Sequence, residues 1–285
     1  MIPKLIWCFW HSSDLPKSIE KSIMSWRLYN PNYKIHIINK NNIKEFLPEL
    51  NLKNIPNLRE NYTLLSDIIR IHLIYKYGGF WIDSSTFSTM SFDHWLNNVL
   101  CIKKSTEFIG YFNPLFTKRK FMKSSPVLEN WFFCCPKKSK FIKLWKNEFM
   151  KLVRNEDYFE NKLNSNEVDL QLLADKDIYY FRQHIAAQII LQSGYSKENM
   201  IILSAIKGPL KHLICRENEK KTDRQVLMSL CTKKKMWSYP LIKFIAPTRN
   251  IIDNDKKIQS CLFETFDKKV IRDITHKHKT KKKKK

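Results

Sequence analysis

The sequence predicts an α/β fold with a mostly parallel central sheet and helices on its faces. Short apolar and aromatic runs, of the length of buried strands, alternate along its first half with segments in which apolar residues recur at helical spacing. Apolar residues make up 43% of the 285 positions, which is enough for a packed core. Neither a disordered chain nor a membrane-embedded one fits this pattern.

The first four elements follow the order strand, helix, strand, helix. The run "KLIWCFW" at 4–10 predicts a buried strand. A helix follows, for which we expect Asp14 as the N-cap and Pro16 in the first turn. Residues 33–39 predict the second strand, and a short helix after them ends or kinks at Pro48.

The stretch "YKYGGFWIDSS" at 75–85 joins the best helix of the chain, 62–77, to another strand. Gly78 stands where a left-handed residue would end the helix, and Gly79 permits a sharp reversal. The strand "FWID" then places Asp83 at its carboxyl end. Ligands of open α/β sheets bind at the carboxyl ends of strands, so Asp83 is a candidate site residue.

Later segments complete a single domain. Residues 127–135 predict a strand, and the segments after Pro136 and at 179–192 predict helices. No internal repeat or linker interrupts the chain. We therefore expect one domain at 1–272, followed by a disordered basic tail at 273–285, whose lysines repel one another.

The charge is strongly basic, with 51 Lys and Arg against 27 Asp and Glu and a net charge of +24. Such a balance suits nucleic acid, an anionic membrane surface or a phosphate-bearing substrate. The tail is either a solubilising segment or a contact with anionic lipid at the inner face of the plasma membrane. We expect a cytoplasmic protein, because no apolar run is long enough to span a membrane and the N-terminus lacks the apolar centre of a secretory signal.

The seven cysteines form no C-x-x-C pair, so reduced, buried thiols are expected rather than a zinc site.

Three charged residues near the two glycines are candidate site residues: Asp67 and Arg70 before them and Asp83 after them. Asp67 and Arg70 are three apart on the predicted helix, so their side chains point the same way. They form either an exposed ion pair, worth about 0.2–0.5 kcal/mol, or a pair that holds sugar hydroxyls and a phosphate oxygen. Asp83 is either a turn residue or a ligand for a divalent cation.

Trp10 ends the first predicted strand. It is either a core residue or, at the carboxyl end of that strand, a ring on which a nucleotide base stacks.

The segments "IPKLIWCFW", "SWRLYNPNYKIHIIN" and "LSDIIRIHLIYKYGGFWIDSS" resemble, in this order, the capsular polysaccharide synthesis family. That family is similar to the sugar transferases with a DXD motif, which include the Och1-type mannosyltransferases. "ENWFFCCPKKSKFIKLW" resembles the next segment of the family. The combination of S-D-x-x-R, Y-G-G and W-I-D is more specific than any one of its pieces.

The resemblance implies a GT-A fold and a hexosyltransferase that uses a UDP- or GDP-sugar, with retention of configuration. The acceptor it implies is a glycan, either free or lipid-linked. By resemblance, Trp10 stacks on the base and Asp67 and Arg70 contact the ribose and the donor sugar. Asp83 is the first Asp of the DXD motif, which holds Mn²⁺ or Mg²⁺.

Two further positions depend on the resemblance alone. The second Asp of the motif is Ser85 here, which we expect to ligate the metal directly or through water, although a hydroxyl is a poorer metal ligand than a carboxylate. The segment "YPLIKFIAP" at 239–247 faintly resembles one that closes over the donor, which makes Lys243 a phosphate contact.

Two alternatives stay open. A basic nucleic-acid-binding protein would explain the charge, but the sequence carries no nucleic-acid-binding motif and we expect no specific nucleic-acid partner. The other alternative is a catalytically weak sugar-nucleotide-binding member of the same fold, because of Ser85.

Overall fold

The computed structural model describes residues 1–53, 55–56, 58–59, 61–165, 167–174, 176–218, 220–232 and 237–282, without the side chains of 215–218 and 274–282. Its chain divides into two compact units. Unit 1 comprises Met1–Ser13, Asn32–Asp83 and Ile102–Ala205, and unit 2 comprises Asp14–Pro31, Ser84–Cys101 and Ile206–Lys285. Each unit is described by itself.

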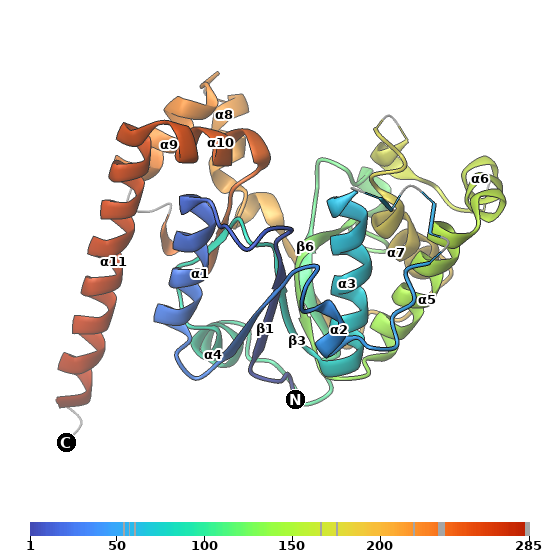
Figure 1. Ribbon diagram of the computed structural model, residues 1–285, viewed down its shortest axis with the longest axis horizontal. Helices are drawn as coiled ribbons and strands as arrows, with labels where there is room; N and C mark the ends of the chain where they lie inside the picture. Colours follow the sequence, from blue (N-terminus) through green and yellow to red (C-terminus); the bar gives the residue numbers. More distant parts are fainter. Residues whose placement is uncertain are drawn as a thin grey trace. The chain divides into compact units, whose positions relative to one another are not determined.

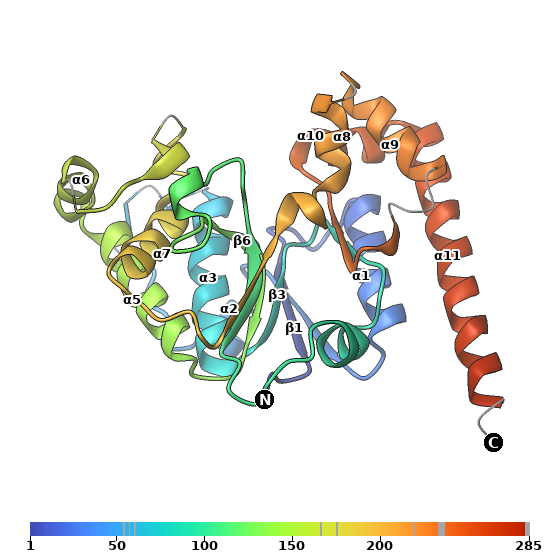
Figure 2. The same ribbon diagram turned by 180° about the vertical axis from the view of Figure 1, so that it is seen from behind.

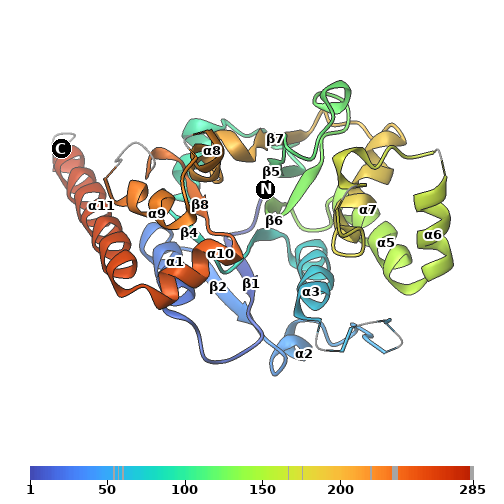
Figure 3. The same cartoon turned by 90° about the horizontal axis from the view of Figure 1, so that it is seen from above.

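A six-stranded sheet forms the centre of unit 1, in the order β2-β1-β3-β6-β5-β7. The strands are β1 (Leu5–Phe9), β2 (Lys34–Ile38), β3 (Gly79–Ile82), β5 (Phe108–Phe112), β6 (Leu128–Cys135) and β7 (Met200–Ser204). Figure 3 shows β2 and β7 at the two edges of this sheet. The pairs β1–β2, β1–β3 and β5–β7 are parallel, while β6 runs antiparallel to both of its neighbours. The predicted α/β class with a mostly parallel sheet is therefore confirmed.

One face of this sheet is covered by the helices α3 (Tyr62–Tyr77), α5 (Lys140–Arg154) and α7 (Arg182–Gln192), which lie together in Figure 1. The core between them is rich in aromatic side chains, and Phe108 packs against Phe133, Phe141 and Trp145. Ser139 caps α5, because its hydroxyl accepts from the Ile142 backbone N–H. The smaller helices of unit 1 are α2 (Ile43–Phe46) and α6 (Glu156–Asn164), with 3-10 turns at Arg119–Phe121 and Gln171–Leu173.

The two adjacent glycines connect α3 to β3 as predicted, but through a different conformation. Gly78 has φ 68° and ψ −161°, so its φ is left-handed while its ψ is extended. This region is essentially restricted to glycine. Its carbonyl accepts a hydrogen bond from the Trp7 indole at 3.0 Å, and its N–H bonds to the Ile74 carbonyl. A Cβ on Gly79 would lie 2.5 Å from the Leu5 carbonyl oxygen, so only glycine fits beside β1.

Unit 2 consists of helices around a two-stranded antiparallel ribbon, β4 (Thr86–Ser88) and β8 (Leu241–Lys243). The helices are α1 (Lys17–Tyr29), α4 (Phe92–His94), α8 (Lys211–Asn218), α9 (Asp223–Thr232), α10 (Ala246–Asn254) and α11 (Lys256–Lys282), with a π-helical turn at Trp95–Val99 and a 3-10 turn at Ala205–Lys207. In Figure 2, α8, α9 and α10 gather at one end of α11. The predicted N-cap of α1 is wrong, because the cap position is Pro16 rather than Asp14.

The predicted boundary between a domain at 1–272 and a tail at 273–285 stays a prediction. The helix α11 runs across position 272, and residues 283–285 lie outside the described chain. Within the described residues, no helix is long and apolar enough to cross a membrane.

The prediction of reduced, buried thiols fails in part. Cys231 and Cys261 form a disulfide between α9 and α11, and Cys101 is an exposed free thiol. Cys8, Cys134 and Cys135 are buried and free, as expected, while the side chain of Cys215 lies outside the described part.

Candidate active site

Arg70 bridges two carboxylates at the carboxyl end of β3. Its Nη1 lies 2.8 Å from Asp67 Oδ1, and its Nη2 lies 3.1 Å from Asp83 Oδ1. Asp67 and Arg70 are both buried, at 4% exposure each, whereas the Asp83 side chain is 26% exposed. The exposed ion-pair alternative is therefore excluded, because this pair lies inside unit 1 and reaches a third charged group.

The secondary structure explains why these three side chains meet. Residues three apart on α3 share a face, which aligns Asp67 with Arg70. The glycine turn folds β3 back beside α3, and Asp83 follows the last residue of β3. The backbone N–H of Asp83 donates to the Trp131 carbonyl at 2.8 Å, so the sheet fixes this position.

The Asp83 carboxylate has a second donor on its own strand. The Trp81 indole N–H donates to Asp83 Oδ1 at 3.0 Å, and the Arg70 guanidinium lies 5.1 Å from the centre of the Trp81 ring. The ring face and the carboxylate thus both stabilise the guanidinium.

A layer of amides from β6 and α7 completes the cluster. Asn130 donates to Asp67 Oδ1 at 3.3 Å and to Gln183 Oε1 at 2.9 Å, and Arg70 Nη1 donates to the same Gln183 oxygen at 3.2 Å. The Arg70 Nε and the Gln183 Nε2 are buried, and neither has a hydrogen-bond partner among the described residues. Unsatisfied buried donors are costly, and a polar ligand in reach would satisfy them.

Burial raises the pKa of the Asp67 carboxyl to about 6, since the buried charge loses its hydration. The Arg70 guanidinium and His184 oppose this rise, and Asp83 adds to it. Burial and then the charges of Asp67 and Asp83 raise the pKa of Tyr180 to about 12, so Tyr180 lies in the surroundings of the cluster although its side chain is 53% exposed.

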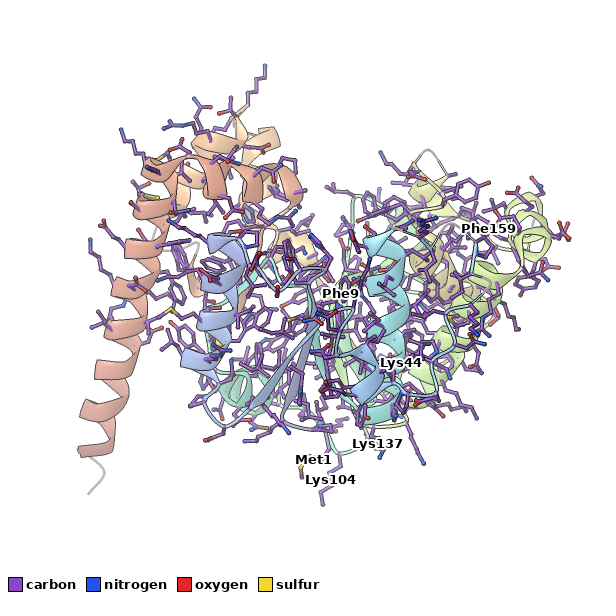
Figure 4. All side chains as sticks on the ribbon, viewed as in Figure 1. Met1, Phe9, Lys44, Lys104, Lys137 and Phe159 are labelled. Carbon is purple, nitrogen blue, oxygen red and sulfur yellow. A yellow bond between two sulfur atoms is a disulfide. The ribbon has the colours of Figure 1, made fainter. Side chains whose placement is uncertain are left out.

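Trp10 follows directly after β1, whose last residue, Phe9, is labelled in Figure 4. The figure places Lys104 and Lys137 beside Met1, at the opposite end of the strand. The Trp10 ring lies 5.1 Å from His11, and His11 stacks on Tyr62 at 4.6 Å, the first residue of α3. A rise of 1.5 Å per residue puts Asp67 about 8 Å along the helix from Tyr62. The aromatic row therefore joins the end of β1 to the first residue of α3.

Tyr62 also lines a cavity of about 550 Å³ in unit 1. Lys40 lies at this cavity too, with its ammonium 4.5 Å from the centre of the Tyr62 ring. The remaining lining residues are mostly apolar: Ile43, Leu52, Ile55, Leu58, Arg59, Leu65 and Ile69.

Ser85 and Lys243 lie in unit 2, where they contact each other. The Lys243 ammonium donates to Ser85 Oγ at 3.1 Å, and the two residues are 8% and 4% exposed. The β4–β8 ladder pairs Thr86 with Lys243, and the Phe244 N–H donates to the Ser85 carbonyl at 2.9 Å. The backbone thus holds this lysine beside the serine.

The predicted metal ligands do not fit a divalent cation. Asp83 Oδ1 accepts from a guanidinium and an indole, and Ser85 Oγ accepts from an ammonium. Mg²⁺ and Mn²⁺ prefer carboxylate oxygens, and positive neighbours repel them. No group of three or more His, Cys, Asp or Glu side chains suited to a metal ion occurs among the described residues.

One residue of this cluster, Gln183, was not predicted from the sequence. Gln183 was part of a predicted helix without a role, yet it is fully buried and accepts from both Arg70 and Asn130. Its neighbours His184 and Gln188 are also buried polar residues. Arg182 is a fourth buried polar residue of α7, and polar residues within so apolar a helix were the available sign. The donor-binding roles predicted for Trp10, Asp67, Arg70, Asp83, Ser85 and Lys243 stay predictions.

Comparisons with known proteins agree with the sequence resemblance. The family model described as "Capsular polysaccharide synthesis protein" matches residues 1–239. The chain is 25% identical over 167 residues to the O-glycosyltransferase braB of Annulohypoxylon truncatum, and the match covers 52% of this chain and 37% of that relative. The chain thus spans well under half the length of the curated relative it matches.

Among solved structures, the chain matches one named "PaToxG Glycosyltransferase" with a TM-score of 0.37 and 14% identity. The match covers 92% of this chain and 87% of that one.

Proposed function

Because the chain belongs to the capsular polysaccharide synthesis protein family, we propose that it is a glycosyltransferase that moves a sugar from a nucleotide-sugar donor to a glycan acceptor. One observation carries the proposal most directly: Arg70 joins Asp67 and Asp83 at the carboxyl end of β3. A polar ligand is expected at this edge of a mostly parallel sheet. The glycosyltransferase name of the partial relative supports the same activity.

We propose that Trp10, Asp67 and Arg70 contact the donor and that three further residues hold them in place. Trp10 offers a half-buried ring for the base, at the start of the aromatic row. The ionised Asp67 accepts hydrogen bonds from hydroxyls of the ribose or the donor sugar. Arg70 presents a rigid guanidinium to a hydroxyl or phosphate oxygen, and Asp83 orients that guanidinium. The amides of Asn130 and Gln183 fix the geometry of the pair.

In the transfer reaction the nucleoside diphosphate is the leaving group, and the protein must stabilise it. As the bond between the anomeric carbon and the β-phosphate oxygen breaks, negative charge gathers on the diphosphate. Cationic donors held in place before the reaction stabilise such a charge without reorganising. Arg70 is held by two carboxylates and an amide, so it meets this requirement.

Finer features of the proposal derive from the family resemblance. They are a UDP- or GDP-sugar as donor, a hexosyl group transferred with retention, and an acceptor glycan that is free or lipid-linked. We also propose that the reaction takes place at the cytoplasmic face of the plasma membrane, where the lysine-rich segment 273–285 would meet anionic lipid.

Nucleotide-sugar turnover by the full chain tests the activity. UDP-glucose, UDP-galactose, UDP-N-acetylglucosamine and GDP-mannose are supplied in turn, and both the released UDP or GDP and the melting temperature are measured. We expect one donor to raise the melting temperature, since a ligand that binds the native state stabilises it. The same donor should be turned over. No shift and no turnover with any donor would contradict the proposal.

The variant Asp83→Asn tests whether turnover depends on the cluster around Arg70. An asparagine oxygen can still accept from Arg70 and Trp81, so the variant should fold, but its lost charge releases the hold on the guanidinium. Turnover should fall about 100-fold, the size associated with one lost transition-state contact. The control Glu49→Gln removes the charge of a carboxylate that forms an exposed ion pair with Lys76, a residue of α3. It should leave turnover unchanged. Turnover that survives Asp83→Asn would refute the site.

A further inference from the structure

Ser85 stands where the DXD motif has its second metal-binding carboxylate, and its side chain contacts the ammonium of Lys243 instead of a metal ligand's usual partner, a divalent cation. Ser85 stands two residues after Asp83, and its hydroxyl accepts from the Lys243 ammonium at 3.1 Å. A neutral hydroxyl is a weak ligand for a divalent cation, and an ammonium on the same oxygen repels one. The positive charge beside Ser85 therefore comes from the Lys243 side chain.

Backbone contacts within unit 2 fix that charge in place. Lys243 ends β8, which pairs with β4 so that Thr86 lies opposite Lys243. The Lys243 N–H donates to the Pro209 carbonyl at 3.1 Å, and the next N–H, of Phe244, donates to the Ser85 carbonyl at 2.9 Å. The lysine is 8% exposed, so its ammonium is held at a defined position rather than free in solvent.

Asp83, the first residue of the motif, is likewise paired with a positive side chain, the Arg70 guanidinium of unit 1. Asp83 Oδ1 receives the Arg70 guanidinium at 3.1 Å and the Trp81 indole at 3.0 Å. A chain of two residues spans at most about 7 Å. Connectivity alone therefore keeps Ser85 near Asp83, whatever the arrangement of the two units.

We propose that the Lys243 ammonium, anchored on Ser85, serves in place of a divalent cation at the diphosphate of the donor, so that binding and transfer need no metal. This inference depends on the proposed glycosyltransferase function. In the transfer step the bond from the anomeric carbon to the β-phosphate oxygen breaks, and its electron pair stays on that oxygen. Lys243 donates a hydrogen bond to the oxygen. The acceptor oxygen bonds to the anomeric carbon and releases its proton to solvent.

Calorimetric titration of the full chain with UDP and with GDP tests the proposal. Each nucleotide is titrated once with excess EDTA and once with excess MnCl₂. We expect one of them to bind with the same affinity, within about twofold, in both conditions; each tenfold change in affinity corresponds to about 1.4 kcal/mol. Electron paramagnetic resonance of Mn²⁺ added alone should show the spectrum of the free ion. Binding that requires Mn²⁺ would overturn the inference and leave the proposed function intact, whereas no nucleotide binding in either condition would count against the function itself.

Substitutions then assign the effect to Lys243. The variant Lys243→Met keeps the length of the side chain and loses the charge, so it should weaken diphosphate binding about tenfold or more. Binding of UMP or GMP, which lack the β-phosphate, should change far less. The control Lys257→Met removes an exposed lysine of α11 in the same unit and should change neither affinity. Equal losses for the mono- and diphosphate, with a lower melting temperature, would show a structural role only and overturn the proposal.

The double variant Ser85→Asp with Lys243→Met restores a carboxylate and removes the ammonium. Its nucleotide binding should become sensitive to EDTA, and Mn²⁺ should now give the resonance of a bound ion. A double variant that folds, binds the nucleotide equally well in EDTA and shows no bound Mn²⁺ would contradict the proposal that Lys243 replaces the cation.

Discussion

Arg70 is the residue around which the candidate site is arranged. Its guanidinium contacts Asp67, Asp83, Gln183 and the hydroxyl of Ser66, with all four distances between 2.8 and 3.2 Å. A lysine would not replace it, because an ammonium is a point charge and lacks the planar fork that reaches two carboxylates in fixed directions. The sequence spacing indicated that Asp67 and Arg70 share a helix face, but not that this face is buried.

The raised pKa of Asp67 makes the site sensitive to acid. A carboxyl with a pKa of about 6 is ionised above that pH and neutral below it. Only the ionised form accepts hydrogen bonds from sugar hydroxyls through both oxygens and pairs with Arg70. Donor affinity should therefore fall as the pH is lowered from 7.5 through 6, and the midpoint of that loss should lie near the pKa.

The pH dependence of donor affinity in the wild type and in Asp67→Asn checks this prediction. The asparagine does not titrate, so the variant should bind more weakly at pH 7.5 and lose the dependence between pH 7 and 5. The wild type and the Glu49→Gln control should share one profile. A variant that keeps the wild-type midpoint would assign the titration to another group.

At the scale of elements, the glycine turn decides where Asp83 lies. Both glycines have positive φ, at 68° and 92°. Gly79 also lies so close to β1 that a Cβ would meet the Leu5 carbonyl oxygen at 2.5 Å. Positive φ and the close approach to β1 are separate reasons for a glycine at this position. Another glycine of the chain has positive φ but no close neighbour.

That glycine is Gly194, which has φ 90° and no atom within 4 Å of an added Cβ. Gly194→Ala should lower the free energy of unfolding by about 1–2 kcal/mol, from the left-handed conformation alone. Gly79→Ala should cost more than this, above about 2 kcal/mol, because the backbone of β1 cannot move aside. Denaturant unfolding of both variants measures the difference. Equal losses would show that the close approach to Leu5 does not matter.

At the scale of the whole molecule, the net charge of +24 permits a nucleic-acid-binding alternative. Binding through charge alone falls steeply with salt, by about 10³–10⁵-fold between 50 and 200 mM salt for a protein with 6–10 phosphate contacts. We expect any binding of random-sequence duplex DNA to follow this decline. Nucleotide-sugar turnover at the higher salt should be unaffected by added DNA.

Fluorescence anisotropy of a labelled duplex, measured beside donor turnover across the salt series, checks both expectations. DNA binding that persists at high salt, in a protein that turns over none of the nucleotide sugars, would favour the nucleic-acid alternative. Inhibition of turnover by DNA only at low salt would instead reflect general attraction to a basic surface.

The sequence by itself determined the local features of this protein. Apolar periodicity gave the strand at Leu5–Phe9 and the helix at Tyr62–Tyr77, because burial of one face imposes its repeat on the residues. The paired glycines marked the reversal before β3, since few other residues adopt positive φ. Family resemblance pointed to Trp10, Asp67, Arg70 and Asp83, and the last three lie in one cluster.

The tertiary structure alone decided which distant side chains complete that cluster. Gln183 is 113 residues from Arg70, and Lys243 is 158 residues from Ser85. No local pattern encodes such contacts, because they depend on which strands and helices pack together. The same reason explains two features that the sequence did not predict. Strand β6 is antiparallel to β3, and the Ser85 hydroxyl accepts a hydrogen bond from the Lys243 ammonium.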